Sequence, residues 1–229
     1  LNKKSIASVK SAGYSDLLNE HKKDYRSLYS RVDFQLGNTK NEAIPTDERL
    51  EAYASGKPDP SLEALYFQYG RYLMISSSRP GTLPANLQGK WNDKNNPPWA
   101  SDYHANINIQ MIYWPVEVTN LSECHLPLIE YIDKLREPGR KTAQEFFNTR
   151  GWVVNTMNNT FGFTAPGWSF PWGFFPGGAA WYGRHVWEHY DFTGDKDYLQ
   201  NKGYPIMKEA ALFWLDYLTQ DNEGFLVSS

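Results

Sequence analysis

The sequence predicts an all-α protein in which helix pairs are joined by long, chemically rich loops. Three observations lead to this class. Apolar residues recur at helical spacing in about six segments, turn residues bound most of these segments, and only Gly151–Asn155 is expected to be extended. The sequence shows no internal repeat of 20–50 residues. Long loops favour part of an α/α-barrel over a helical bundle, whose loops are usually short.

The first part of the chain contains two expected helices and a connector. Ser15 is the expected N-cap of a helix that continues to Leu36, before a glycine. The stretch 38–58 is polar and contains two prolines, which predicts a connector. A helix over 59–75 follows, with Asp59 as its cap and a proline in its first turn.

The second part alternates helices with two aperiodic stretches, 82–103 and 158–178. Both stretches are rich in aromatic residues, asparagine, glycine and proline. A loop this long inside a compact domain is usually disordered or functional, and the tryptophans and prolines argue against disorder. The expected helices are 107–118, with a kink or break at Pro115, one that begins at Pro127, and then 179–192 and 204–218.

Composition excludes several function classes. The formal net charge is −3, so the chain has no electrostatic surface for nucleic acid or anionic lipid. No apolar run is long enough to span a membrane, and no signal peptide is recognisable. Cys124 is the only cysteine, which excludes an internal disulfide and an all-Cys metal site. The sequence starts at Leu1 and closes on an apolar run, so both ends are interpreted as cuts in a longer chain.

Aromatic residues give the first indication of a ligand. The chain has 9 Trp, 15 Tyr and 12 Phe, and many of them lie in the aperiodic stretches. Aromatic rings in loops can form flat surfaces for sugar rings, whereas core aromatics follow the helical period. Trp168 and Trp172 are therefore candidates for a sugar platform, with core packing as an equal alternative.

The segment His104–Trp114 carries the most specific polar pattern. His104, Asn106 and Asn108 follow one another at a spacing of two residues, which places all three side chains on one face if the backbone is extended. Asparagine cannot act as a general base, but its carbonyl oxygen can accept a hydrogen bond from a water molecule and orient it. The alternative is that the two asparagines cap a helix.

Five motifs together resemble a known family. The segment 104–115, HANINIQMIYWP, resembles the HxNxNxQMxYWP signature of glycoside hydrolase family 95. Four further segments resemble motifs of that family in the same order: 45–50, 83–92, 175–181 and 187–195. Departures are Ala105 in place of Thr, Ile112 in place of Asn, and the residues 182–184.

The resemblance implies a fold and an activity. It implies an (α/α)₆ catalytic barrel whose N-terminal portion is 46–229, preceded by a helical linker over 1–45. Family 95 enzymes remove terminal α-linked L-fucose with inversion, often from an α-1,2 linkage, and some members prefer L-galactose. The expected partners are a fucosylated glycan and the remaining part of the same enzyme chain, with no cofactor, no nucleic acid and no membrane. A bacterial, periplasmic or secreted origin is expected.

The resemblance also implies residue roles. Asn106 and Asn108 match the asparagines that position the attacking water, and His104 matches a histidine that contacts the sugar. Thr46 matches a further sugar contact. The general acid, a Glu, and the general base, an Asp, are expected C-terminal to this sequence, so the chain alone should be inactive.

Two functions of other classes remain open. His185 and His189 frame an HxxEH pattern, which in some zinc proteases places two ligands on one helical face with a Glu as base. That pattern needs a third ligand, and a structural role between packed helices is the alternative. A non-catalytic carbohydrate-binding helical domain would use the same Trp and Asn surface. We expect no metal.

Overall fold

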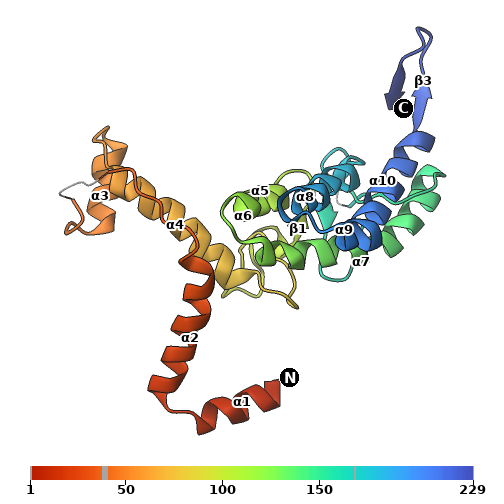
Figure 1. Cartoon of the computed structure of the whole chain (residues 1–229). Helices are drawn as coiled ribbons and strands as arrows, with labels where there is room; N and C mark the ends of the chain where they lie inside the picture. The colour runs from red at the N-terminus through yellow and green to blue at the C-terminus, as the bar shows by residue number, and fades with distance from the viewer. Residues whose placement is uncertain (1, 38–40, 168, 229) are drawn as a thin grey trace. The chain divides into compact units, whose positions relative to one another are not determined.

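The computed structural model describes residues 2–37, 41–167 and 169–228, and most of these residues are helical (Figure 1). The predicted all-α class is confirmed. Strands within the described ranges are limited to two short antiparallel pairs, β1 (Tyr103–His104) with β2 (Met157–Asn158) and β3 (Leu218–Gln220) with β4 (Leu226–Ser228). None of the helices in these ranges combines the length and the apolar character that crossing a membrane requires.

The chain forms two compact units, residues 1–75 and 76–229. The first unit contains α1 (Asn2–Ser11), α2 (Tyr14–Tyr29), α3 (Thr46–Ala54) and most of α4 (Pro60–Ser77). The family resemblance predicts a different division, a linker over 1–45 and a barrel over 46–229. That division follows the family's domain boundaries and not the packing of this chain, so it stays a prediction.

Helix α2 is shorter than the sequence predicts. It begins after Gly13 rather than Ser15, and it ends at Tyr29 instead of continuing to Leu36. The reason is a tertiary contact, because the guanidinium group of Arg71 donates to the carbonyl of Tyr29 (2.8 Å) and to the carbonyl of Leu28 (3.1 Å). They add side-chain donors to the carbonyls of the last helical turn, where the Leu28 carbonyl also accepts from the N–H of Arg31 (3.3 Å).

The expected connector 38–58 contains a helix, so that prediction was wrong over 46–54. Arg49 of α3 donates from Nε and Nη2 to the two carboxylate oxygens of Asp59, both at 2.9 Å, and the pair is buried. Asp59 also accepts from the backbone N–H of Leu62 (3.1 Å), which confirms its predicted role as the cap of α4. One carboxylate thus caps α4 and holds α3 against it.

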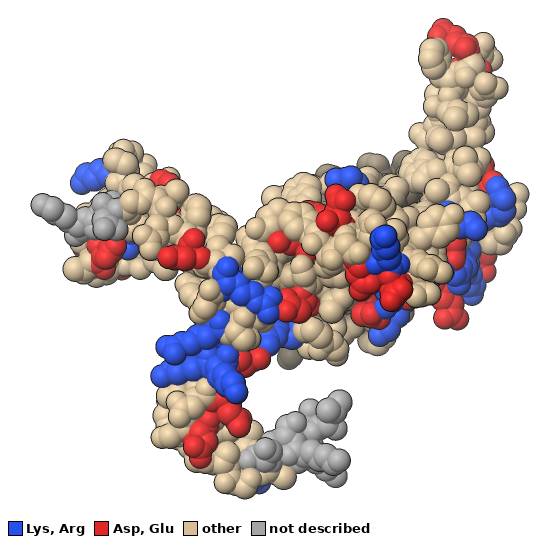
Figure 2. Space-filling view, in the orientation of Figure 1, with Lys and Arg blue, Asp and Glu red and all other residues tan. Residues whose placement is uncertain are grey.

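The second unit is built on three longer helices, α7 (Ser122–Phe147), α8 (Gly178–Thr193) and α10 (Tyr204–Tyr217). The predicted break at Pro115 is confirmed, because the segment divides into α5 (Asn108–Tyr113) and α6 (Pro115–Val118). The shorter elements are η1 (Pro98–Ser101), α9 (Lys196–Tyr198) and the π-helical turn η2 (Leu199–Gly203). Figure 2 shows charged side chains gathered over α7, α9 and α10, whereas the β3–β4 hairpin carries its acidic residues at the tip.

Helix α7 begins five residues before the predicted start at Pro127. Ser122 donates to the carboxylate of Glu117, and His125 donates to the same carboxylate at 2.8 Å. These contacts fix the first turn of α7, and Pro127 is accommodated inside the helix. Pro127 was expected to mark the start of a helix, but the contacts of Ser122 and His125 with Glu117 place the start five residues earlier.

The arm 151–155, predicted to be extended, forms no strand, and its first residue, Gly151, has a φ of 71°. It lies against two helices of the second unit. The N–H of Val153 donates to the carbonyl of Gly139 in α7 (3.2 Å), and the indole N–H of Trp152 donates to the carbonyl of Ile206 in α10 (3.1 Å). A Cβ atom on Gly139 would lie 2.8 Å from the Val153 carbonyl oxygen, so only glycine allows this approach. The core lies around this arm and includes the fully buried side chains Ile109, Tyr113, Leu128, Ile129, Ile132, Trp152, Tyr182 and Phe213.

Candidate active site

A small cavity in the second unit brings together most of the residues that the sequence singles out. Its volume is about 260 Å³, and its lining includes His104, Asn106, Asn108 and Trp172. Four of the six predicted site residues therefore share one cavity. The remaining lining residues are Leu87, Trp99, Thr156 and Met157.

The polar side of the cavity is built by β1, a turn and the start of α5. His104 pairs with Met157 of β2, and the N–H of Ala105 donates to the carbonyl of Thr156 (2.9 Å). The backbone is therefore extended up to the turn that carries Asn106. Asn108 is the first residue of α5.

Asn106 and Asn108 do not cap a helix. The N-cap position of α5 is Ile107, and no side chain caps this end. Both asparagine side chains are exposed, and within the described ranges neither donates to or accepts from another group. Their amides are therefore available to a ligand or to water in the cavity.

Gln110 holds the turn that presents these asparagines. Its side chain is fully buried, and its Nε2 donates to the carbonyl of Ala105 at 2.5 Å. This bond closes the turn across Asn106 and Asn108, because it joins Ala105, which precedes Asn106, to Gln110, which lies two residues after Asn108. Ala105 is itself fully buried, so its carbonyl depends on a protein partner.

Trp99 lines the cavity from an unusual backbone. Trp99, Ala100 and Ser101 have φ angles of 55°, 57° and 52°, three consecutive non-glycine residues in the left-handed region. This conformation costs about 1–2 kcal/mol per residue. Hydrogen bonds hold it in place, from the N–H of Ala100 to the carbonyl of Pro97 and from the N–H of Asp102 to the carbonyl of Trp99, both at 3.2 Å.

The indole of Trp99 contacts His104. The two ring centroids lie 5.8 Å apart and the ring planes meet at 87°. Burial lowers the pKa of His104, so its neutral form is favoured near pH 7. Burial also raises the pKa of the neighbouring Asp102, which does not line the cavity. No described lining residue of the cavity is a carboxylate.

Trp172 belongs to the aromatic stretch 158–178, which forms a loop whose backbone segments lie close together. The side-chain oxygen of Asn155 accepts from the N–H of Phe175 (3.0 Å), and the carbonyl of Gly173 accepts from the N–H of Thr156 (3.3 Å). A Cβ atom on Gly173 would lie 1.4 Å from the carbonyl oxygen of Gly167, so glycine is required for this closure.

The structure does not test the two remaining predicted sugar contacts. Thr46 is the exposed first residue of α3 and belongs to the first unit. Trp168 lies outside the described residues. Both assignments stay predictions.

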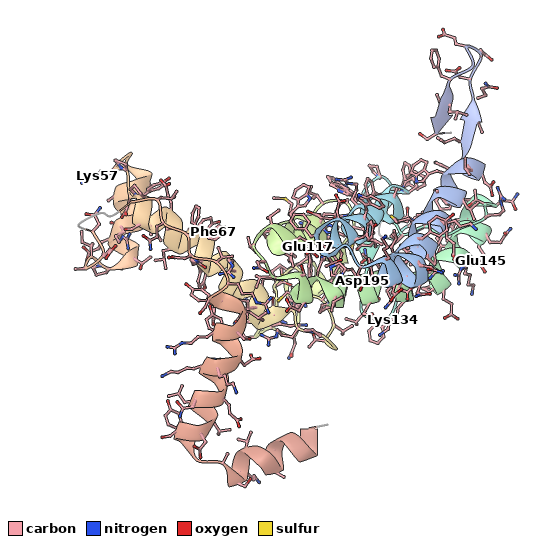
Figure 3. All side chains as sticks on the ribbon, in the orientation of Figure 1. Lys57, Phe67, Glu117, Lys134, Glu145 and Asp195 are labelled. Carbon is pink, nitrogen blue, oxygen red and sulfur yellow. The ribbon has the colours of Figure 1, made fainter. Side chains whose placement is uncertain are left out.

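The HxxEH histidines belong to a buried hydrogen-bond network. The carboxylate of Glu117 (labelled in Figure 3) accepts at Oε1 from Nδ1 of His125 (2.8 Å) and Nδ1 of His189 (2.7 Å). Ser122 donates to the other carboxylate oxygen, and Nε2 of His125 lies 3.0 Å from Nδ1 of His185. Burial raises the pKa of Glu117, but the three donors outweigh it and lower the pKa to about 2.

This network does not have the arrangement that the zinc-protease alternative requires. That alternative uses His185 and His189 as joint ligands with Glu188 as base, whereas the two histidines contact different partners. The group whose ligand atoms lie within 4.8 Å of one another is Glu117, His125 and His189. Its short N···O distances are those of hydrogen bonds to a carboxylate, so the predicted structural role between packed helices is the one that the geometry supports.

The fold and the cavity define a class of protein. An all-α unit that gathers a histidine, two asparagines and exposed tryptophans around one cavity is typical of domains that bind and cleave carbohydrates. A family model described as the glycosyl hydrolase family 95 catalytic domain matches residues 13–229. The chain belongs to glycosyl hydrolase family 95.

Relatives in this family carry fucosidase names. The chain is 44% identical over 227 residues to "Alpha-L-fucosidase 2" of Arabidopsis thaliana, which covers 96% of this chain and 27% of that protein. It is 44% identical over 220 residues to "Probable alpha-fucosidase A" of Aspergillus niger, which covers 93% of this chain and 28% of that protein. The chain thus spans about a quarter of the length of these relatives, and they come from a plant and a fungus.

Sequence reasoning missed four lining residues, Leu87, Trp99, Thr156 and Met157. Thr156 and Met157 are visible only through the pairing of β1 with β2, which joins segments about 50 residues apart. Trp99 stands in an aperiodic loop next to two prolines, and that position was a usable signal. The left-handed backbone of Trp99 could not be predicted from the sequence, because no glycine stands at this position.

Proposed function

We propose that this chain forms the water-holding side of the active site of an α-L-fucosidase that releases terminal α-linked L-fucose with inversion. The observation that carries the proposal is the meeting of His104, Asn106, Asn108 and Trp172 at one cavity. The proposal is supported by membership of family 95 and by the fucosidase names of relatives at 44% identity. The α-1,2 linkage, the (α/α)₆ barrel and a bacterial origin belong to the same proposal and rest on the resemblance.

In the proposed mechanism the two asparagines orient the nucleophile. The side-chain oxygen of one asparagine accepts one hydrogen of a water molecule, and the amide N–H of the other donates to the water oxygen. The second hydrogen then faces the general base, and the remaining lone pair is aligned with the anomeric carbon of the sugar. An inverting enzyme also needs a general acid and a general base about 6.5–9.5 Å apart. We place both carboxylates on the parts of the enzyme that follow the region matched by this chain.

The apolar lining favours L-fucose over the alternative, L-galactose. The two sugars differ only at C6, where L-fucose has a methyl group and L-galactose a hydroxymethyl group. Leu87 and Met157 are the apolar, non-aromatic residues among those that line the cavity, and they suit the methyl group. A hydrophobic contact of this kind discriminates against an added hydroxyl by about 10²-fold at most, so we expect slow but measurable hydrolysis of the α-L-galactoside.

The test follows the anomeric proton of the released sugar. The intact protein, this chain together with the rest of its family 95 enzyme, is incubated with α-1,2-fucosylated lactose and monitored by proton NMR. We expect β-L-fucose as the first product, before mutarotation. α-L-Fucose as the first product would contradict inversion. Binding of the trisaccharide without release of fucose would instead favour the non-catalytic carbohydrate-binding domain.

A further inference from the structure

We propose that Asn158 is a positioning residue that holds, from behind the cavity, the turn that carries Asn106 and Asn108. This inference rests on the proposed function, and it gives a role to a residue that neither lines the cavity nor belongs to the five family motifs. Two observations carry it: the way in which the Asn158 side chain is held, and the backbone carbonyl to which it donates.

Asn158 lies on the face of the β1–β2 pair that is turned away from the cavity. It is paired with Tyr103, whereas the neighbouring pair, His104 and Met157, lines the cavity. Successive side chains of a strand point to opposite faces, and neither Asn158 nor Tyr103 is among the lining residues. Because Asn158 is only 1% exposed, its side chain acts on the site through other protein groups.

The side-chain oxygen of Asn158 joins two helices of the second unit. Its Oδ1 accepts from the hydroxyl of Tyr131 in α7 (3.1 Å) and from the hydroxyl of Tyr182 in α8 (3.0 Å). Burial raises the pKa of both tyrosines, so both hydroxyls stay protonated and donate. These two bonds fix the amide group, because the oxygen must face the hydroxyls and the nitrogen must then face the other way.

The side-chain nitrogen of Asn158 bonds to the carbonyl that supports the turn. Its Nδ2 donates to the carbonyl oxygen of Thr156 (3.3 Å), and the N–H of Ala105 donates to the same oxygen (2.9 Å). The carbonyl of Ala105 in turn accepts from Gln110. Ala105 is thus held at both of its backbone polar groups, and a displacement of the Thr156 carbonyl would be passed through Ala105 to the next residue, Asn106.

The position of the turn matters because it sets the position of the attacking water in the proposed mechanism. A misplacement of about 1 Å can lower a rate by about 10²-fold. A displaced water slows the chemical step but leaves the binding of the sugar largely unchanged. We therefore expect the loss in kcat and not in KM, a pattern that general destabilisation of the fold does not produce.

The experiment measures kcat and KM for α-L-fucosyl fluoride with the intact protein and its Asn158→Ala variant, well below their melting temperatures. Tyr182→Phe is a milder second variant, because it removes one of the two hydroxyls that hold Asn158. Asn159→Ala is the matched control, since the Asn159 side chain accepts from the N–H of Phe161 (3.0 Å), on the side away from the turn. Hydrogen exchange of the amides of segment 104–110 is measured in all variants.

We expect Asn158→Ala to lower kcat by about tenfold or more with KM little changed, and Tyr182→Phe to lower kcat less. Combined with Asn108→Ala, Asn158→Ala should add little further loss, because the water is already released. The amides of segment 104–110 should exchange faster in Asn158→Ala than in the wild type. Asn159→Ala should change neither kcat nor this exchange.

An unchanged kcat in Asn158→Ala would overturn the proposal, and so would losses that multiply fully in the double variant. If Asn158→Ala does not fold, Tyr182→Phe decides: a lower kcat at unchanged KM supports the proposal, and an unchanged kcat overturns it. If the wild-type protein releases no fluoride, the proposed function fails. The exchange of segment 104–110 then decides the role of Asn158, since faster exchange in the variant supports it and equal exchange overturns it.

Discussion

At the scale of single residues, the site depends on one turn between an extended segment and a helix. The spacing of His104, Asn106 and Asn108 predicted that they share a face if the backbone is extended. All three line the cavity, although only His104 lies in a strand, because Asn106 lies in the turn and Asn108 begins α5. The sequence could not predict which groups hold the turn. The sequence showed Gln110 only as one position of the family motif and gave it no role. The structure shows its buried hydrogen bond to the Ala105 carbonyl.

Gln110→Met tests that role. Methionine has a similar length but cannot donate to the Ala105 carbonyl, which lies in a fully buried residue. Leaving this acceptor without its partner should lower the free energy of unfolding by about 1–3 kcal/mol. Because the turn carries both asparagines, kcat should fall as well. Gln110→Leu also removes the donor and serves as the second variant; an unchanged melting temperature and kcat in both would contradict the assignment.

At the scale of elements, close backbone approaches fix the helices around the cavity. A Cβ atom on Gly178, the first residue of α8, would lie 2.4 Å from the Val154 carbonyl oxygen and 3.1 Å from the Cβ of Ala105. Helix α8 therefore rests directly on the arm 151–155 and on the residue that precedes Asn106. Nothing in the sequence distinguishes this glycine from others in the aromatic stretch.

Gly178→Ala should therefore destabilise the protein by about 1–3 kcal/mol, as overpacking does in a close-packed core. It should also lower kcat, because the shift is transmitted to Ala105. Gly183→Ala in the same helix is the control, since its Cβ would meet only the Met207 side chain at 3.7 Å. That variant should be neutral or more stable by up to about 1 kcal/mol. Equal melting temperatures for the two variants would contradict the packing argument.

The hydrogen-bond network around Glu117 links α6, α7 and α8. The packing of these three helices should therefore weaken at acidic pH. Burial, with the neighbouring His125 and Arg184, lowers the pKa of His185 to about 3, and hydrogen bonds lower that of Glu117 to about 2. Both pKa values are depressed in the folded state, so both groups stabilise at neutral pH. His185 loses its contribution as pH falls below about 6.5, and Glu117 as pH falls below about 4.5.

Between pH 7 and pH 4 the His185 contribution alone should fall by about 3 kcal/mol. The measurement is the protection of α8 amides against hydrogen exchange, corrected for the intrinsic pH dependence. His185→Gln is the control, because its amide can still donate to His125 but does not titrate, and the change between pH 6.5 and 4.5 should then disappear. Protection that is independent of pH in the wild-type protein would refute the proposed coupling.

Helix boundaries show where sequence patterns stop being informative. The cap at Asp59 and the break at Pro115 follow from local chemistry, and the structure confirms both. The end of α2 depends on Arg71, more than 40 residues away, and the start of α7 depends on Glu117 and His185. Arg71 and His185 lie outside any local window. Glu117 and Asp59 are nearer in sequence to the residues that they fix, but the apolar spacing that predicts helices does not show which polar side chains pair.

At the scale of the whole molecule, the proposed function assigns one part of the active site to this chain. It spans 27% and 28% of the two relatives' lengths. In the second unit, α8 and α10 border an open and mainly apolar groove of about 710 Å³ that includes Trp187, Trp214 and Leu215. Apolar surface of this kind usually marks an interaction site, which agrees with the expected role of the rest of the enzyme as a partner.

We therefore expect the 229-residue chain alone to release no fucose. The described lining of its cavity offers amide, imidazole and hydroxyl groups but no carboxylate for proton transfer. The assay compares the chain with the intact protein at equal molar concentration on α-1,2-fucosylated lactose. Turnover by the chain alone would contradict the placement of the acid and the base outside it.

The central claim is that Asn106 and Asn108 hold the same water molecule, and a double-mutant cycle on kcat tests it most directly. The intact protein, Asn106→Ala, Asn108→Ala and the double variant are assayed with α-L-fucosyl fluoride, and melting temperatures confirm that the variants fold. Each single variant should lose about 10²-fold or more in kcat. The double variant should be scarcely slower than the slower single one, because either change already releases the water. Unchanged rates in the single variants, or losses that multiply fully in the double variant, would contradict the account.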